Sequence, residues 1–228
     1  MERLGGVGGI VPVLIQGVIF DADGTLVDSE EPGMDVLHVL AQAQGVRLTR
    51  EAAYQQFRGV RMAECIAWIA AQLPATAPGF EADFMAQVRR ETEVRFRQGV
   101  DPMPGALALL QSLQLPFCVA TNGPREKVEL TLGLSGLRSL FGDRIFCAYE
   151  VGHFKPDPGL FLHAAQALGI APAHCAVVED SLPGLQAGLA AGMQVFSLHP
   201  PEGLPAAMVE RLTFIQGLAE LAPVLKRD

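Results

Sequence analysis

The sequence lacks three features that would assign it to a membrane, a disulfide framework or a zinc site. No apolar segment reaches the roughly 20 residues of a membrane-spanning helix. The four cysteines are far apart and form no C-x-x-C pair, which is typical of reduced thiols in the cytoplasm. Residues 1–12 are interrupted by glycines, and their apolar part is too short for a signal peptide. We therefore expect a cytoplasmic protein in which residues 1–12 form an N-terminal extension.

Positive charge is also scarce. The chain has 17 Lys and Arg against 25 Asp and Glu, a net charge of −8, and contains no run of basic residues. Because nucleic acids bind to clustered cations, this composition argues against a nucleic-acid partner. An anionic small molecule would need a local positive site that opposes the overall charge. Nothing in the composition indicates the oligomeric state.

What is abundant is apolar sequence, which makes up half of the 228 residues and suits one core with a modest second module. A short apolar run at 14–20 predicts a buried strand, and apolar residues then recur at helical spacing from 32 to about 99. Beyond residue 102, short apolar segments alternate with amphipathic helices expected near 124–132, 158–168 and 183–191. The predicted strands of this part are 117–121, 144–149, 175–180, 194–198 and 212–215.

This alternation predicts a parallel sheet with right-handed crossovers, a doubly wound, Rossmann-like α/β core. The helical block after the first strand predicts an inserted all-helical cap. We expect the core to comprise 13–29 and 102–228 and the cap 30–101. The two connections, near Ser29 and Asp101, should lie close together, because both join the cap to the core.

Polar side chains follow four of the predicted strands, and the carboxyl ends of parallel strands meet at one edge of the sheet. These side chains comprise acids, a hydroxyl, an amide and an amine: Asp21, Asp23, Thr121, Asn122, Lys155, Glu179 and Asp180. A single acid at such a position is often only a helix cap or a residue of a solvated turn. Polar residues after four strands at the same edge are poorly explained by capping. The set predicts a functional site at this edge.

The chemistry that this set permits is phosphoryl transfer. Asp21, Glu179 and Asp180 are oxygen ligands suited to Mg²⁺. Asp21 can act as a nucleophile, and Asp23 can protonate the leaving oxygen and later activate water. Thr121, Asn122 and Lys155 can stabilise the phosphoryl oxygens.

Four segments, in this order, resemble the motifs of the haloacid dehalogenase superfamily of phosphotransferases: DADGTLVDSE, ATNG, KPDP and VVEDS. The resemblance implies a helical cap, Asp21 as nucleophile and Asp23 as acid and base. It further implies Mg²⁺ held by Asp21, the Asp23 backbone carbonyl and Asp180, with Glu179 at or next to the metal. Thr121, Asn122 and Lys155 would then surround the phosphoryl group as catalytic and substrate-binding residues.

Longer stretches around these motifs are similar to the bacterial 6-phosphogluconate phosphatase type, a neighbour of β-phosphoglucomutase. This similarity implies a small phosphorylated sugar or sugar acid as substrate. In the cap, Arg58, Gly59 and Arg61 form a glycine-centred loop whose guanidinium groups could bind a substrate carboxylate, or be ordinary surface arginines. Two alternatives to a phosphatase stay open: a phosphomutase, and a non-catalytic protein that binds phosphorylated metabolites.

Overall fold

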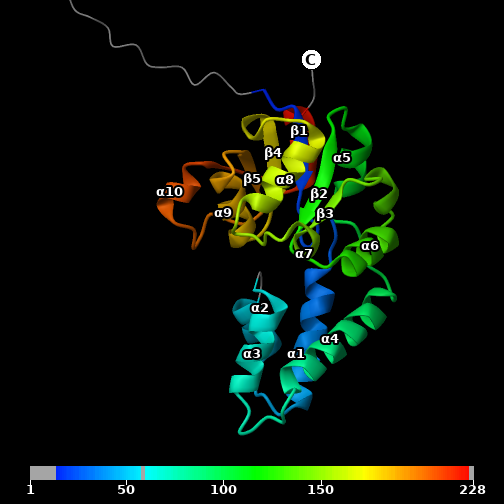
Figure 1. The fold of residues 1–228 in the computed structure, drawn as a ribbon, viewed down its shortest axis with the longest axis vertical. Coiled ribbons are helices and arrows are strands. Elements are labelled where there is room, and N and C mark those ends of the chain that lie inside the picture. The colour runs from blue at the N-terminus through cyan, green and yellow to red at the C-terminus, as the bar shows by residue number, and fades with distance from the viewer. Residues whose placement is uncertain (1–13, 58–59, 226–228) are drawn as a thin grey trace, which may run out of the picture.

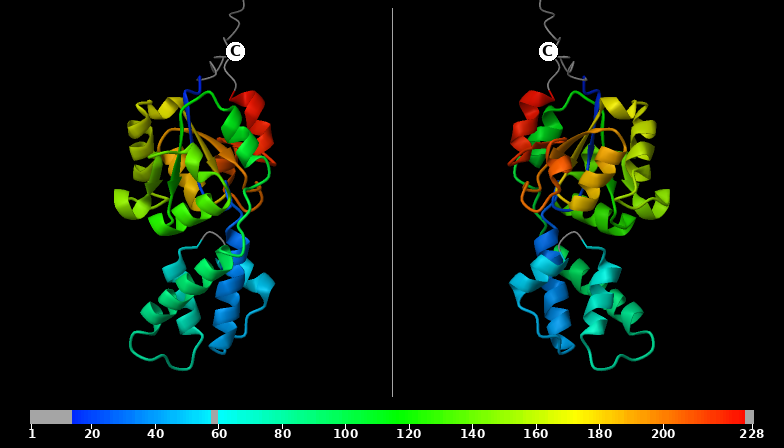
Figure 2. Two further views of the ribbon diagram at one scale, coloured as in Figure 1. Left: turned by 90° about the vertical axis from the view of Figure 1, so that its right-hand side faces the viewer. Right: turned by 90° about the vertical axis from the view of Figure 1, so that its left-hand side faces the viewer.

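The core of the protein is a six-stranded, fully parallel sheet in the order β3-β2-β1-β4-β5-β6. The structure, a computed structural model, describes residues 14–57 and 60–225. Chain connections run outward from β1 in both directions, so the predicted doubly wound α/β core is confirmed (Figures 1 and 2). The strands are β1 (Gly17–Phe20), β2 (Phe117–Thr121), β3 (Ile145–Cys147), β4 (Cys175–Glu179), β5 (Gln194–Ser197) and β6 (Leu212–Phe214).

Alternate residues of the central strand supply two separate cores, one on each face of the sheet. Val18 and Phe20 belong to one buried cluster, and Ile19 between them belongs to the other. Both faces of a doubly wound sheet are covered, which is why its strands are continuously apolar. The first face is covered by α5 (Ala106–Ser112), α6 (Arg125–Leu134) and α11 (Leu221–Val224), with the 3-10 turns η1 (Arg138–Leu140) and η3 (Leu218–Glu220). The second is covered by α7 (Ala148–Val151), α8 (Gly159–Leu168), α9 (Leu182–Ala190) and α10 (Ala206–Val209), with η2 (Pro172–His174) before β4.

Four helices lie between β1 and α5 in the sequence, and they pack as a unit beyond the carboxyl ends of the strands (Figure 1). They share a third buried cluster, separate from the two sheet cores, that includes Leu37, Ile69 and Phe84. These helices form the inserted helical cap, whereas its bounds at 30 and 101 stay a prediction. The helices are α1 (Glu30–Ala43), α2 (Arg50–Phe57), α3 (Met62–Ala71) and α4 (Phe80–Phe96).

The two connections between this helical unit and the sheet lie side by side, as expected. Val27 forms an antiparallel bridge with Pro102, and the Asp28 amide donates to the Asp101 carbonyl at 3.0 Å. Because these segments are bonded to each other, the helical unit leaves and re-enters the core at one place.

Three local predictions needed correction. The strands expected at 14–20 and 144–149 are shorter, because strand length is set by what the neighbours can pair: β1 pairs from Gly17, and β3 pairs only opposite Val119–Thr121. After Cys147 the chain turns into α7 instead. Within the helical block expected at 32–99, no separate apolar pattern indicated α2, because only Ala53 and Phe57 of its eight residues are buried. Within the described residues, no helix has the length and apolar character needed to cross a membrane.

The cap cluster generates a stability prediction. Leu37 of α1 is fully buried, whereas Val39 on the same helix is 61% exposed. Leu37→Ala should lower the free energy of unfolding by about 2–5 kcal/mol, because it removes buried methyl groups and leaves a cavity. The matched control Val39→Ala should change it by less than about 0.5 kcal/mol. Urea denaturation of both variants measures this, and equal midpoints would contradict the packing of α1.

Candidate active site

The carboxyl ends of β1, β2 and β4 bring acid and hydroxyl groups together at the edge of the sheet that faces the cap, and the loop between α7 and α8 adds the amine of Lys155 (Figure 1). The Asp21 amide donates to the Val178 carbonyl at 3.0 Å, which extends the pairing of β1 with β4 by one residue. Asp21 therefore lies next to the end of β4, where Glu179 and Asp180 follow. All three of these acids are buried.

Lys155 lies between two of these carboxylates. Its Nζ donates to Asp21 Oδ1 at 2.5 Å and to Glu179 Oε1 at 2.7 Å, and the residue is only 4% exposed. Burial acts to lower the pKa of Lys155, but Asp21 and Glu179 outweigh it and the pKa is raised. Burial raises the pKa of Asp21, Lys155 opposes this shift, and Glu179 adds to it. Lys155 is thus a fixed positive charge beside Asp21.

Glu179 is held from both of its oxygens. While Oε1 accepts from Lys155, Oε2 accepts from the Asp180 amide at 3.0 Å and from the amide and hydroxyl of Ser181, both at 2.9 Å. Ser181 also caps α9, accepting from the Gly184 amide. A Cβ on Gly184 would lie 1.8 Å from Glu179 Oε1, so helix α9 can approach this carboxylate only because residue 184 is glycine.

Asp21, Glu179 and Asp180 form a three-acid group in which each residue offers one carboxylate oxygen, and these three oxygens lie within 4.8 Å of one another. Asp180 Oδ1 also accepts from the Thr25 hydroxyl at 3.2 Å. Oxygen ligands at this spacing suit a hard divalent cation such as Mg²⁺.

The Asp23 carboxylate points to a different set of partners. Lys127 Nζ of α6 donates to Asp23 Oδ2 at 2.8 Å, and the Ser29 hydroxyl donates to Oδ1. Burial acts to raise the pKa of Asp23, but the Lys127 ammonium and these two hydrogen bonds outweigh it, so the pKa is lowered. The Asp23 side chain is therefore separate from the three-acid group, and the role of its backbone carbonyl as a metal ligand stays a prediction.

The two polar residues after β2 differ in what their side chains do. The Thr121 hydroxyl accepts from the Gly123 amide at 3.0 Å, which leaves its own O–H available as a donor. The Asn122 amide is bonded at both ends to the backbone of Lys155, with Nδ2 donating to its carbonyl at 3.2 Å and Oδ1 accepting from its amide at 2.9 Å. Asn122 therefore fixes the Lys155 loop onto β2.

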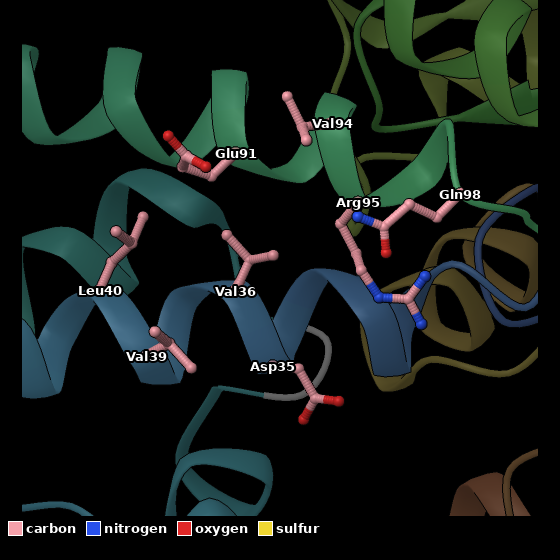
Figure 3. A pocket seen from close by; sticks show the side chains of 8 residues that line it. All are labelled: Asp35, Val36, Val39, Leu40, Glu91, Val94, Arg95 and Gln98. Atoms are coloured by element: carbon pink, nitrogen blue, oxygen red, sulfur yellow. The ribbon is translucent and has the colours of Figure 1, made fainter.

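Of the three predicted cap residues, the structure describes only Arg61. Arg61 pairs with Glu64 of α3 through a 64%-exposed side chain, and its described contacts include none of the site acids. Arg58 and Gly59 lie outside the described residues. The cap has a groove of about 290 Å³ between α1 and α4, shown in Figure 3, which contains none of the predicted site residues. It is lined by Asp35, Val36, Val39, Leu40, Glu91, Val94, Arg95 and Gln98.

Four residues of the site were not identified from the sequence: Thr25, Ser29, Lys127 and Ser181. Thr25, Ser29 and Ser181 lie within the first and last motifs, so their place in those motifs was a usable signal. Lys127 has no such signal, because a lysine in the first turn of an amphipathic helix is usually a solvated residue. Only the packing of α6 against the end of β1 brings it to Asp23.

Comparisons with known proteins agree with this arrangement. The family model of the haloacid dehalogenase-like hydrolases matches residues 15–192. The chain is 36% identical over 182 residues to 6-phosphogluconate phosphatase of Escherichia coli (strain K12), covering 80% of this chain and 81% of that protein. It is 32% identical to hexitol phosphatase A of the same organism, covering 83% and 86%. A crystal structure of a haloacid dehalogenase family hydrolase from Deinococcus radiodurans R1, with bound phosphate and sodium, superimposes with a TM-score of 0.73 at 30% identity, covering 95% and 100%.

The contact between α9 and Glu179 generates a prediction. Gly184→Ala should lower the free energy of unfolding by about 1–3 kcal/mol, because the new methyl group overlaps a buried carboxylate that Lys155 and Ser181 hold in place. Gly133→Ala in α6 is the matched control, since nothing lies within 4 Å of its added Cβ. It should stabilise the protein by about 0.5–1 kcal/mol through helix propensity. Urea denaturation followed by circular dichroism compares them, and a stabilising Gly184→Ala would refute the close contact.

Proposed function

The chain belongs to the haloacid dehalogenase-like hydrolases and is a phosphoric monoester hydrolase of that family, and we propose that it acts through an aspartyl-phosphate intermediate with Mg²⁺. The class of substrate is a small phosphorylated metabolite of the sugar phosphate kind. The observation that carries the proposed mechanism is Asp21, with Lys155 on Oδ1 and two further acids beside it.

In this proposal Asp21 is the nucleophile. Lys155 occupies Oδ1, whereas Oδ2 accepts no hydrogen bond from the described part of the chain, so Oδ2 is the oxygen placed to react. It bonds to phosphorus as the bond from phosphorus to the ester oxygen breaks. Lys155 and the Thr121 hydroxyl then stabilise the negative charge on the phosphoryl oxygens.

Asp23 is proposed to handle the protons. It gives a proton to the departing ester oxygen, then takes one from the water that attacks the phosphorus of the intermediate, and this second step releases phosphate and restores Asp21. The lowered pKa of Asp23 in this structure suits the second step. For the first step, the contact with Lys127 has to open so that Asp23 can carry a proton.

The residues proposed to hold Mg²⁺ are Asp21, Asp180 and the backbone carbonyl of Asp23, with Glu179 beside them. When bound, the ion offsets the carboxylate charge and polarises a phosphoryl oxygen. All donors of the three-acid group are carboxylate oxygens, and this chemistry supports magnesium over softer metals.

The finer substrate proposal is a phosphorylated sugar acid. It rests on the 36% identity to a protein named 6-phosphogluconate phosphatase and on the exposed guanidinium of Arg61 in the cap. The Arg61–Glu64 pair is a surface ion pair of small net value, so a substrate carboxylate could replace Glu64. The proposed carboxylate-binding loop also includes Arg58 and Gly59, which lie two to three residues before Arg61 in the sequence.

A phosphate-release assay tests the proposed function. The purified protein with Mg²⁺ should release phosphate from p-nitrophenyl phosphate and, with higher kcat/KM, from 6-phosphogluconate. Asp21→Asn should lower kcat by at least about three orders of magnitude, or ~4 kcal/mol, because it removes the attacking charge. Asp143→Asn, an exposed acid outside the site, is the matched control and should retain full activity.

Three results would contradict parts of this proposal. An Asp21→Asn variant with a tenth of the wild-type kcat would exclude the covalent intermediate. Transfer of the phosphoryl group from a hexose 1-phosphate to a sugar hydroxyl, rather than to water, would make the protein a phosphomutase. A wild-type protein that binds but does not hydrolyse phosphate esters would be a binding protein.

Calorimetric titration of Mg²⁺ separates the two aspartates. Asp180→Ala should weaken Mg²⁺ binding markedly, because it removes a proposed ligand. Asp23→Asn should leave binding largely intact, because its carboxylate is turned toward Lys127 and Ser29. The same Asp23→Asn variant should still lose about two to four decades of turnover, as expected for a lost general acid. Equal losses of Mg²⁺ affinity in the two variants would show that their roles are not distinct.

A further inference from the structure

The Lys155 ammonium has a third neighbour besides Asp21 and Glu179. It lies over the ring of Phe161, with Nζ 4.8 Å from the ring centroid. Phe161 is the third residue of α8 and is fully buried. The ring belongs to the core cluster between α8 and the sheet, so its position is fixed by the fold, not by the site.

The face of an aromatic ring offers Lys155 an attraction of a particular kind. The ring carries negative charge density on its face and attracts a cation within about 6 Å, most strongly where water is excluded. It contributes no conventional acceptor, so the ammonium N–H groups stay directed at oxygens. A third carboxylate in its place would stabilise the charge equally but would repel an incoming phosphate.

Lys155 needs such a constraint because its side chain is flexible. An ammonium on a four-carbon stem is a mobile point charge, unlike the planar guanidinium of arginine. Asn122 fixes the backbone of Lys155, but the end of the side chain is held only by its contacts. Two of these contacts are hydrogen bonds to the carboxylate oxygens of Asp21 and Glu179, and the third is the contact with the face of the Phe161 ring.

We propose that Phe161 is a positioning residue of the active site, and that the face of its ring holds the Lys155 ammonium against Asp21. This inference rests on the proposed function, in which Lys155 stabilises the phosphoryl group. The rings of Phe96 and Phe117 also lie near cations, Lys127 at 6.0 Å and Arg144 at 5.2 Å. Phe161 differs from them because its cation bonds Asp21, the proposed nucleophile.

Fluorinated phenylalanines introduced at position 161 test the proposal. One, two and three fluorines withdraw charge density from the ring face stepwise while changing its size little. The kcat for p-nitrophenyl phosphate should fall with each fluorine, by about tenfold in total for the trifluoro ring. The same series at Phe141 is the matched control, since this ring is also fully buried and packs edge-on against Phe117. It should leave kcat unchanged.

A second measurement tests the contact without relying on activity. In the protein with Lys155, the urea midpoint should decrease along the fluorine series. In a Lys155→Met background the midpoint should not change along the series, because no cation remains over the ring. Removal of Lys155 leaves two buried carboxylates without their partner, and this background can fail to fold. If it does not fold, the fluorine series in the protein that retains Lys155 still tests the contact.

The outcomes separate this inference from the proposed function. A constant kcat along the Phe161 series in an active enzyme would overturn the positioning role and leave the proposed function intact. Equal losses in the Phe161 and Phe141 series would also overturn it, because they would show a general effect of fluorine on packing. If the wild-type protein hydrolyses no phosphate ester, the proposed function fails, and the urea series alone then decides whether the ring holds the ammonium.

Discussion

Mutual repulsion among buried carboxylates is the constraint on which the rest of this site depends. Asp21, Glu179 and Asp180 are all buried at one edge of the sheet, where like charges are costly unless a cation or donors compensate them. Lys155 bonds two of the three acids at once, and the donors of Ser181 and Thr25 satisfy further oxygens. The clustering of three carboxylates is what makes the site suited to a divalent cation.

The scaffold that holds these groups is built from elements distant in sequence. Lys155 is positioned by a loop that Asn122 ties to β2, and Glu179 is positioned by the start of α9, which needs glycine at 184 to approach. Apolar clusters on both faces of the sheet fix the strands that carry these groups. The apolar contacts that stabilise the core therefore also fix the geometry of the site.

Asp23 connects the site to the cap. Its carboxylate accepts from Ser29, which immediately precedes α1 at the first connection, and from Lys127 of the core helix α6. Lys127 also lies 6.0 Å from the ring centroid of Phe96, the last residue of α4. The acid proposed to move protons is thus in contact with groups on both sides of the junction between cap and core.

Much of this organisation could be read from local patterns. Short apolar strands between amphipathic helices predicted the doubly wound sheet, and the ordered polar residues after those strands predicted the acids and the lysine that now lie together. Strand lengths and helix α2 could not be predicted, because pairing partners decide where β1 begins and β3 ends, and because α2 buries only two side chains. Ordered motifs are local, whereas strand ends and weakly buried helices are decided by their neighbours.

The sequence by itself determined which residue types reach the edge of the sheet, because an apolar run followed by polar residues marks where each strand ends. Only the tertiary structure decided how those residues are paired. It turned the Asp23 carboxylate toward Lys127, used both ends of the Asn122 amide on the Lys155 backbone, and placed the Phe161 ring against the Lys155 ammonium. The physical reason is that each of these contacts joins side chains from separate elements, and their directions are set by packing.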